Sequence, residues 1–234
     1  AAGYLVRPLG HASRVLVIEG GAAKAIEAMQ LDYAVRSLSK LGFERLVAGS
    51  QVGAIAFAKG AQRINKKAGA PLVLLGMAAA KLEKFEDAVE AFRAGFQPDA
   101  PIPAEGRVAM RGNAFFGYVL LKDKSKAAAK EAVKVLERAV ALEKFAEEED
   151  TTFATRQNLA RAYVRTGQLD RAFPMLQKAL ELGKIKLGGA GLMNYIKAQV
   201  GTAEEWKPYL EDERFKRAIE NATGQTSVEE EEGL

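Results

Sequence analysis

Few residues in this chain could carry out chemistry by their type and spacing. The 234 residues include one histidine, His11, and no cysteine. A disulfide, a zinc site built from cysteine and histidine, and a Cys–His catalytic pair are therefore excluded. A Ser–His–Asp triad could use only His11, which has no partner residue in the surrounding sequence. We expect His11 to be a surface residue and the chain not to be an enzyme.

Glycine-rich and acidic segments are the other candidates for ligand binding. The runs 20–24 and 188–191 lack the glycine order of a phosphate-binding loop, and neither follows a convincing strand. The acidic runs 147–150 and 229–232 could hold a hard cation loosely, but neither has the spacing of an EF-hand. We interpret them as a solvated loop and a solvated tail. The sequence therefore predicts no metal and no cofactor.

Positive charge is concentrated in the first third of the chain. Residues 1–70 hold 10 basic and 4 acidic side chains, whereas residues 71–152 sum to −2 and residues 153–234 to zero. Such a basic region could attract nucleic acid or anionic lipid. We favour the other interpretation, a surface that meets an acidic protein partner or keeps the chain in solution.

The N-terminal residues also bear on location. The first 18 residues contain Arg7, His11 and Arg14 but no acid, which is compatible with a position just after a removed organellar presequence. An arbitrary start point explains the same composition, so the compartment stays open between an organelle interior and the cytoplasm. No run approaches the roughly 20 apolar residues that a membrane-spanning helix needs.

The spacing of apolar residues predicts helices from about residue 22 onward. Ala22, Ile26, Met29 and Tyr33 recur at intervals of four, three and four residues, as on one face of a helix. Breaks between helices are expected at 67–71, at the three prolines of 97–103, and at glycines 183, 188, 189 and 191. The strand-like run 14–18 has no apparent partner strand, so we expect a helix or an extended arm there. The predicted fold class is all-α.

Three stretches of the chain share one pattern of large and small residues. Each opens with a large residue followed by a small one, at Leu75-Gly76, Phe116-Gly117 and Leu159-Ala160. After 12, 15 and 12 residues respectively come a small, a large and a small residue: Ala88, Phe92 and Gly95; Ala132, Leu136 and Ala139; Ala172, Leu176 and Ala179. The small residues would let paired helices approach closely, and the large residue would fill the gap to the next pair.

The third stretch resembles the tetratricopeptide repeat family. In that family a leucine–small pair, a tyrosine, a turn glycine and a later alanine follow one another, as do Leu159-Ala160, Tyr163, Gly167 and Ala172. The first stretch has Ala79 and the second has Leu120 at the tyrosine position. The resemblance covers about residues 69–183, which we expect to form three helix pairs in a helical-hairpin repeat solenoid.

The remaining segments are predicted to flank these pairs. Leu38-x-x-Leu41-Gly42 precedes Leu72-x-x-Leu75-Gly76 by 34 residues, the period of the family, which suggests a degenerate repeat within the helical N-terminal region 1–68. Residues 184–222 are expected to form capping helices, with Trp206 packed beneath them, because a repeat stack needs a closing element with one polar face. Residues 223–234 are interpreted as an acidic tail.

The family resemblance implies a concave groove, lined by the first helix of each pair, that holds a peptide or a helix of a partner. The Lys–Asn clamp of chaperone-binding members is not matched, because Val73 and Met77 stand at those places. We expect the chain's own N-terminal helices to cover the apolar part around Val73, Met77 and Ala80. The basic part is expected to receive an acidic segment, either of a partner or of the tail 229–232. The predicted contact residues are Arg111, Tyr118, Lys122, Arg156, Gln157, Arg161 and Arg165.

The predicted function is a non-enzymatic protein–protein interaction scaffold, an assembly factor or a peripheral structural subunit of a larger complex. The alternative is an RNA-binding helical-repeat protein that uses the basic N-terminal third. The two functions differ in salt dependence, because binding to nucleic acid weakens steeply as salt rises.

Overall fold

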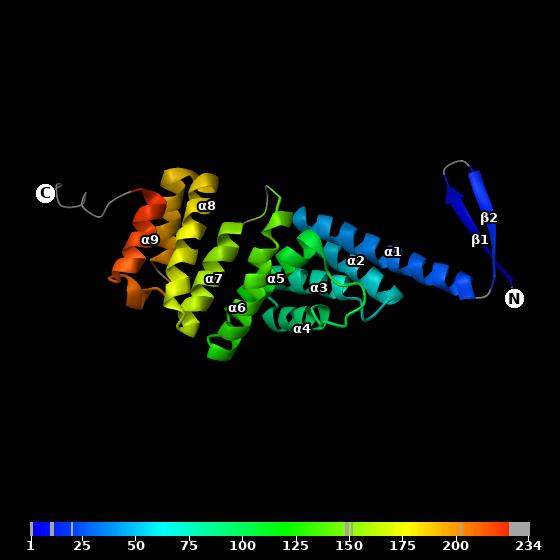
Figure 1. Cartoon of the computed structure of the whole chain (residues 1–234), viewed down its shortest axis with the longest axis horizontal. Helices are drawn as coiled ribbons and strands as arrows, with labels where there is room; N and C mark the ends of the chain where they lie inside the picture. The colour runs from blue at the N-terminus through cyan, green and yellow to red at the C-terminus, as the bar shows by residue number, and fades with distance from the viewer. Residues whose placement is uncertain are drawn as a thin grey trace.

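The computed structural model describes residues 2–9, 12–19, 21–147, 150, 152–201 and 203–224. These residues form an elongated stack of helices with a two-stranded hairpin at its N-terminal end (Figure 1). The helices are α1 (Gly21–Val47), α2 (Gln51–Ile64), α3 (Gly69–Lys81), α4 (Phe85–Gly95), α5 (Gly106–Leu120), α6 (Lys126–Ala141), α7 (Thr152–Thr166), α8 (Leu169–Tyr195) and α9 (Glu213–Thr223). Short helical turns lie at η1 (Glu143–Phe145), η2 (Ile196–Val200) and η3 (Lys207–Tyr209).

Successive helices pack as hairpins, and the hairpins stack side by side. The pairs are α1 with α2, α3 with α4, α5 with α6, and α7 with α8, while α9 packs on α8. The first helices of the pairs also contact one another, α1 with α3, α3 with α5, and α5 with α7. The predicted helical-repeat solenoid is therefore confirmed.

Glycines allow the two helices of a pair to approach as the repeat pattern predicts. A Cβ atom on Gly76 of α3 would lie 2.7 Å from the ring of Phe92 in α4, and one on Gly117 of α5 would overlap Leu136 in α6. Gly42 has the same role in the first pair, because a Cβ there would lie 3.0 Å from Phe57 in α2. The interval of 34 residues between Gly42 and Gly76 thus corresponds to equivalent positions in successive hairpins.

The breaks between helices follow the proline and glycine signals with one exception. Chain turns separate α2 from α3 at residues 65–68 and α4 from α5 at residues 96–105, as expected. Gly183, however, is helical and buried, and the helical dihedrals of α8 are interrupted only at Gly188, where φ is 69° and ψ is 173°. Beyond this kink the chain returns along α7, where Tyr195 lies edge-on to Phe153 at 5.4 Å between ring centroids.

The N-terminal segment differs from the sequence expectation. Strands β1 (Ala2–Leu9) and β2 (Ala12–Glu19) pair antiparallel, with Leu9 opposite Ala12 and Tyr4 opposite Val17. The expectation of a helix or an unpaired arm at 14–18 was wrong, because residues 2–9 supply the partner strand. Gly3 and Pro8 hid that strand, since both residue types are unfavourable within strands.

The core runs continuously through the stack. Val73, Met77 and Ala80 are buried in the same cluster as Phe43 and Leu46 of α1, which agrees with the expected covering of this part by the N-terminal helices. At the other end, Trp206 is fully buried against Phe215 of α9, with 5.5 Å between ring centroids, as expected for a packing residue. His11 and the tail 229–232 lie outside the described residues.

Candidate partner-binding face

Two pairs of arginines lie on the first helices of successive hairpins. Arg107 and Arg111 are one turn apart on α5, and Arg161 and Arg165 are one turn apart on α7. Residues four apart share a face of a helix, so each pair presents two guanidinium groups side by side. Each pair binds a carboxylate of the chain itself.

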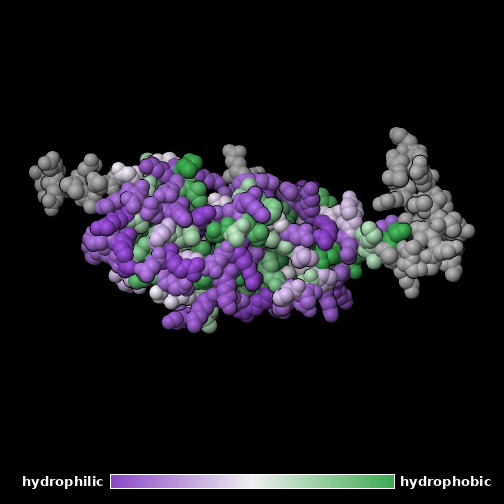
Figure 2. Space-filling view, viewed as in Figure 1, coloured by the Kyte–Doolittle hydropathy of each residue, from purple (hydrophilic) through white to green (hydrophobic). Residues whose placement is uncertain are grey.

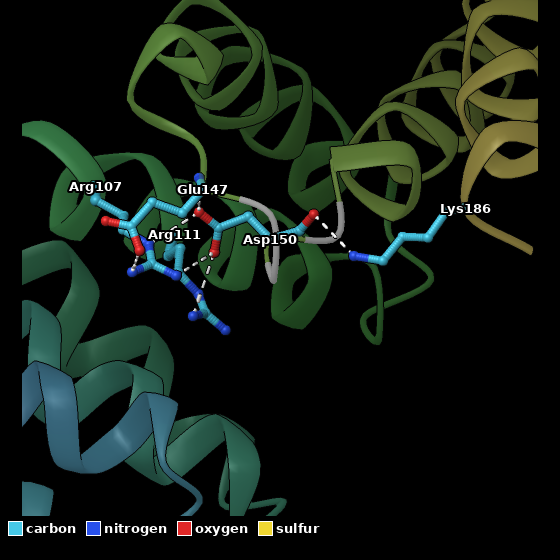
Figure 3. Close-up of polar contacts among 5 residues, drawn as sticks. All are labelled: Arg107, Arg111, Glu147, Asp150 and Lys186. Carbon is cyan, nitrogen blue, oxygen red and sulfur yellow. Dashed lines mark hydrogen bonds and ion pairs between the residues drawn. The ribbon is translucent and has the colours of Figure 1, made fainter.

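The first pair binds Asp150, two residues before the start of α7 (Figure 3). The Nε of Arg107 donates to Asp150 Oδ2 at 3.0 Å, and Arg111 Nη1 lies 3.3 Å from Asp150 Oδ1. The carboxylate is only 2% exposed. It also accepts a hydrogen bond of 2.9 Å from the backbone N–H of Glu147, whose side chain pairs with Arg107. Lys186 of α8 donates to the backbone carbonyl of Asp150 at 3.4 Å.

The same two arginines connect α5 to the first helix of the chain. The ring of Phe43 in α1 lies 5.6 Å from the guanidinium carbon of Arg107 and 5.8 Å from that of Arg111. A cation over an aromatic face is attracted by the ring quadrupole, and more strongly where water is excluded. At the start of α5, Arg36 of α1 pairs with Glu105 at 3.5 Å. Helix α1 therefore covers the N-terminal part of α5.

The second pair binds Glu205, which lies in the segment between η2 and α9. Arg161 donates from Nη2 to Glu205 Oε1 at 2.9 Å, and Arg165 pairs with the same oxygen. Arg165 also donates to the backbone carbonyls of Leu121 at 2.8 Å and Asp123 at 3.1 Å, at the end of α5. Arg165 thus joins three successive parts of the stack.

The environment of Glu205 favours its charged form. Burial by itself opposes the charge, but a hydrogen bond from its own backbone N–H and the two arginines outweigh burial and lower the pKa to about 2. The carboxyl group is 8% exposed. The positive charge in the basic half of the predicted groove is therefore partly offset by an acid of the same chain.

Two further predicted contact residues are also engaged within the protein. Gln157 is buried on α7 and accepts a hydrogen bond from the hydroxyl of Tyr195. Burial raises the pKa of Tyr195, although the nearby Arg161 opposes that shift. Arg156 pairs with Glu143 of η1 and lies 4.0 Å from the sulfur of Met175 in α8. Burial raises the pKa of Glu143, although Arg156 opposes that shift.

Tyr118 and Lys122 form a separate cluster with Phe85, the first residue of α4. The rings of Phe85 and Tyr118 meet edge-on at 6.5 Å, and the Lys122 ammonium lies 4.6 Å from the Tyr118 ring and 5.4 Å from the Phe85 ring. Tyr118 is half-buried and Lys122 is exposed. Of the predicted contact residues, these two have the most open surroundings.

This cluster adjoins a groove between α4 and α6, which we call the α4–α6 groove. Its open volume is about 840 Å³. The apolar residues that line it are Phe85, Val89, Val119, Leu120, Ala127 and Ala128. The charged residues of the groove, which we call its rim, are Glu86, Glu90, Arg93, Lys122, Asp123 and Glu131. Arg93 and Glu131 bridge the two helices at 2.7 Å.

The structure thus divides the predicted site into parts. Gln157, Arg161 and Arg165 lie together on α7, whereas Arg111, Arg156 and the Tyr118–Lys122 pair occupy three other places. Sequence reasoning missed Asp150 and Glu205 as binding partners for the arginines, and it also missed Arg107. The repeated Arg-x-x-x-Arg spacing on two predicted first helices was the available signal, since it marks two equivalent cationic faces.

Part of the chain matches the model of a known protein family. Residues 152–190 match the family model described as the tetratricopeptide repeat. The chain contains a tetratricopeptide repeat. The matched segment covers α7 and most of α8, the pair in which Leu159-Ala160, Tyr163, Gly167 and Ala172 follow the family pattern. No curated protein matches the chain.

Several solved structures match most of the chain. YrrB, described as a TPR protein with an unusual peptide-binding site, is 17% identical, and the match covers 88% of this chain and 92% of YrrB with a TM-score of 0.50. The MamA RS-1 ArsTM double mutant is 25% identical over 83% of this chain and 97% of its own, with a TM-score of 0.45. MamA 41-end from Desulfovibrio magneticus RS-1 is also 25% identical, over 83% and 98%, with a TM-score of 0.46.

The part of the chain that the structure describes contains neither a membrane-spanning helix nor a cluster of metal-ligating side chains. No helix there is long and apolar enough to cross a membrane. No group of three or more histidine, aspartate or glutamate side chains in that part of the chain is placed to hold a metal ion.

Proposed function

We propose that the chain is a protein–protein interaction scaffold that binds a peptide or a helix of a partner in the α4–α6 groove and on the adjoining Tyr118–Lys122 cluster. The helical-repeat fold supports the general role, because stacked helix pairs create extended binding surfaces. A peptide-binding role also agrees with the description of YrrB, which shares the fold.

The observation that carries the finer proposal is the chemistry of the groove. Its apolar lining would accept the apolar face of a helix or the anchor residues of a peptide, and its charged rim would fix their orientation. The half-exposed Tyr118, with Lys122 above it, extends this surface beyond the groove. Aromatic residues with a polar end are enriched where proteins bind one another.

The other predicted contact residues have a different role in this proposal. Arg111, Arg156, Arg161 and Arg165 each pair with an acid of the chain, and Gln157 is buried. Removing one member of a buried ion pair is costly because the other charge is left without a partner. We infer that these five residues hold the stack together and meet a partner only at their exposed edges.

A pull-down with one groove variant tests this function. The substitution Ala127→Glu places a carboxylate in the groove at an exposed position in the first turn of α6, where the helix dipole tolerates an acid. Ala28→Glu is the matched control, an exposed position on α1 far from the groove. Partners retained by each tagged chain from the native extract would be identified by mass spectrometry after nuclease treatment.

The proposal expects a partner that wild-type protein and Ala28→Glu enrich equally and that Ala127→Glu loses at least about tenfold, the effect of a mismatched charge at a binding surface. A partner retained equally by Ala127→Glu contradicts the groove as its binding site. Retention that disappears on nuclease treatment would favour the RNA-binding alternative instead.

A further inference from the structure

Positive charge without an acidic partner lies at the N-terminal end of the stack. Residues 45–82 contain six basic residues and no acid. Lys59 and Arg63 lie one turn apart on the exposed face of α2, and Lys66 and Lys67 follow the helix, also exposed. Among the described residues, none of the ion pairs involves these four cations. The arginines of α5 and α7, in contrast, each pair with an acid of the chain.

Exposed apolar residues lie next to this cationic end. Val35 of α1 lies in one buried cluster with Ala61 and Ala68, which flank Arg63, Lys66 and Lys67 in the sequence. On the N-terminal side of Val35, α1 leaves the stack, and residues 27–33 are all exposed. Met29 is 71% exposed and Tyr33 is 74% exposed.

The projecting part of α1 has no helix beside it. Helix α1 has 27 residues and α2 has 14, so α2 can cover only about half of α1. Figure 2 shows hydrophobic residues on the projecting segment, beside the purple surface of the stack. Ile64, at the end of α2, is also exposed. Exposed apolar residues that gather in one place mark an interaction site.

The hairpin also combines apolar residues with a lack of acids in its sequence. Strand β2 contains four consecutive apolar residues, 15–18, and neither strand contains an acid before Glu19. A two-stranded hairpin alone is at best marginally stable in water, so it needs a further surface to pack on.

We propose that the N-terminal end of the protein docks on an anionic lipid surface. The projecting segment of α1 would lie against the interface with Met29 and Tyr33, which are four residues apart and share one face of the helix, at the level of the acyl chains. Lys59, Arg63, Lys66 and Lys67 would contact the phosphates of the lipid headgroups. Each Lys or Arg near such a surface strengthens binding by about fivefold.

The combination of residues favours lipid over nucleic acid. Nucleic acid binding uses aromatic side chains for base stacking, and the exposed face of α2 (Val52, Ala56, Lys59 and Arg63) has none. Exposed Met29, Leu31 and Ile64 have no role in binding a phosphate backbone but suit the acyl boundary. Glu27, Asp32 and Glu44 reduce the charge, yet residues 24–67 still have eight basic side chains.

The proposal is independent of the α4–α6 groove, which lies in the middle of the stack, so either one can fail alone. The experiment is co-sedimentation of the purified chain with vesicles of phosphatidylcholine alone or with about 30% phosphatidylserine, the class of anionic lipid that attracts polybasic segments. The cationic variant is Lys59→Gln/Arg63→Gln/Lys66→Gln. The matched control, Lys124→Gln/Lys126→Gln/Lys130→Gln, removes three equally exposed charges near the α5–α6 turn. A third variant, Met29→Ser/Tyr33→Ser, removes apolar contacts.

The expected result is binding to the anionic vesicles only, lowered roughly 100-fold by the cationic variant and within about twofold of wild type for its control. Met29→Ser/Tyr33→Ser is expected to lower binding roughly tenfold even where salt screens the charges. Circular dichroism would show that all variants keep the wild-type helix content.

Wild-type protein that does not distinguish the two kinds of vesicle would overturn the proposal, and so would equal losses in the cationic variant and its control. A third arm uses a fluorescent single-stranded RNA. Loss of RNA binding in the cationic variant, with no vesicle binding by wild type, would assign the surface to nucleic acid and reject lipid.

Discussion

Arg161 and Glu205 lie 44 residues apart in the chain and join at 2.9 Å between Nη2 and Oε1. Arg107 and Asp150 make the corresponding contact one hairpin earlier, at 43 residues of separation and 3.0 Å. In both cases a second arginine, one turn further along the helix, contacts the same carboxylate. In each pair, the first helix is therefore tied to the chain segment that follows the second helix of the same pair.

Replacing Glu205 by Gln is expected to destabilise the fold at neutral pH. The pKa of Glu205 is lowered from 4.5 to about 2. Because the folded pKa is the lower one, this stabilisation is complete above pH 4.5 and is lost as pH falls toward 2. At neutral pH the Glu205→Gln variant should lose about 2–3 kcal/mol in the free energy of unfolding, measured by urea denaturation. Near pH 2 the difference from wild type should vanish.

The neighbouring Glu204 provides the control for this prediction. It is 77% exposed and pairs only with Lys207, three residues on. Glu204→Gln should change the free energy of unfolding by less than about 0.5 kcal/mol at any pH, as exposed pairs do. Equal losses in the two variants would mean that the arginine pair of α7 does not stabilise the fold.

Replacing Asp150 by Asn is expected to cost about 3 kcal/mol in the free energy of unfolding. The substitution keeps the shape of the side chain but leaves Arg107 and Arg111 without their shared carboxylate. Thermal unfolding followed by circular dichroism measures the effect. Asp99→Asn, at an exposed position in the α4–α5 loop, should leave the midpoint unchanged. A midpoint for Asp150→Asn equal to that of wild type would contradict the inference that this carboxylate holds the stack.

Replacing Gly117 by Ala is expected to lower the free energy of unfolding by about 1–3 kcal/mol, the usual cost of overpacking a core. The new methyl group would overlap the Leu136 side chain and force α5 and α6 apart. Gly60 of α2 is the matched position, because a Cβ there would meet its nearest atom at 3.8 Å. Gly60→Ala should be neutral or stabilising by up to about 1 kcal/mol, since alanine is the better helix former. Chemical denaturation of both variants measures the change in the free energy of unfolding. A loss only in Gly117→Ala means that this glycine is needed for the close approach of the helices, whereas equal changes in the two variants would contradict that role.

Replacing Tyr163 by Phe is expected to cost about 1 kcal/mol in the free energy of unfolding. Its hydroxyl donates to Glu137 at 2.9 Å, between α7 and α6. Burial, with a further contribution from that hydrogen bond, raises the pKa of Tyr163 to about 12. A spectrophotometric titration should therefore show that Tyr163→Phe has lost a tyrosine that ionises near pH 12 in wild type. A titration curve unchanged in shape would contradict the hydrogen bond.

Local patterns predicted the helical pairs but could not predict how the side chains are paired across the stack. Gly76 and Gly117 were recognisable because the contacts they allow recur at a fixed spacing within one hairpin. The contact between Arg161 and Glu205 depends on where the chain returns after the kink at Gly188, and no periodicity encodes that position. For the same reason the sequence placed the arginines on first helices but did not reveal the acids of the chain that pair with them.

The β-hairpin was missed for a different physical reason. Its register places Tyr4 opposite Val17, a pairing between residues 13 positions apart, and β1 contains two residues that are poor strand formers. The Tyr118–Lys122 cluster was half predicted, since both residues were named. Phe85, which completes it, was not among the predicted contact residues.

The unequal lengths of α1 and α2 have a mechanical consequence. The 13 extra residues of α1 form a rigid spacer of about 20 Å between the hairpin and the body of the solenoid. The helix holds the hairpin at that distance from the solenoid. Because each residue of a helix adds a rotation of about 100°, the length of the helix also fixes the direction in which the hairpin points. Inserting one residue within 27–33 would turn the hairpin by about a quarter of a revolution, whereas inserting seven would nearly restore its direction while lengthening the spacer by about 10 Å.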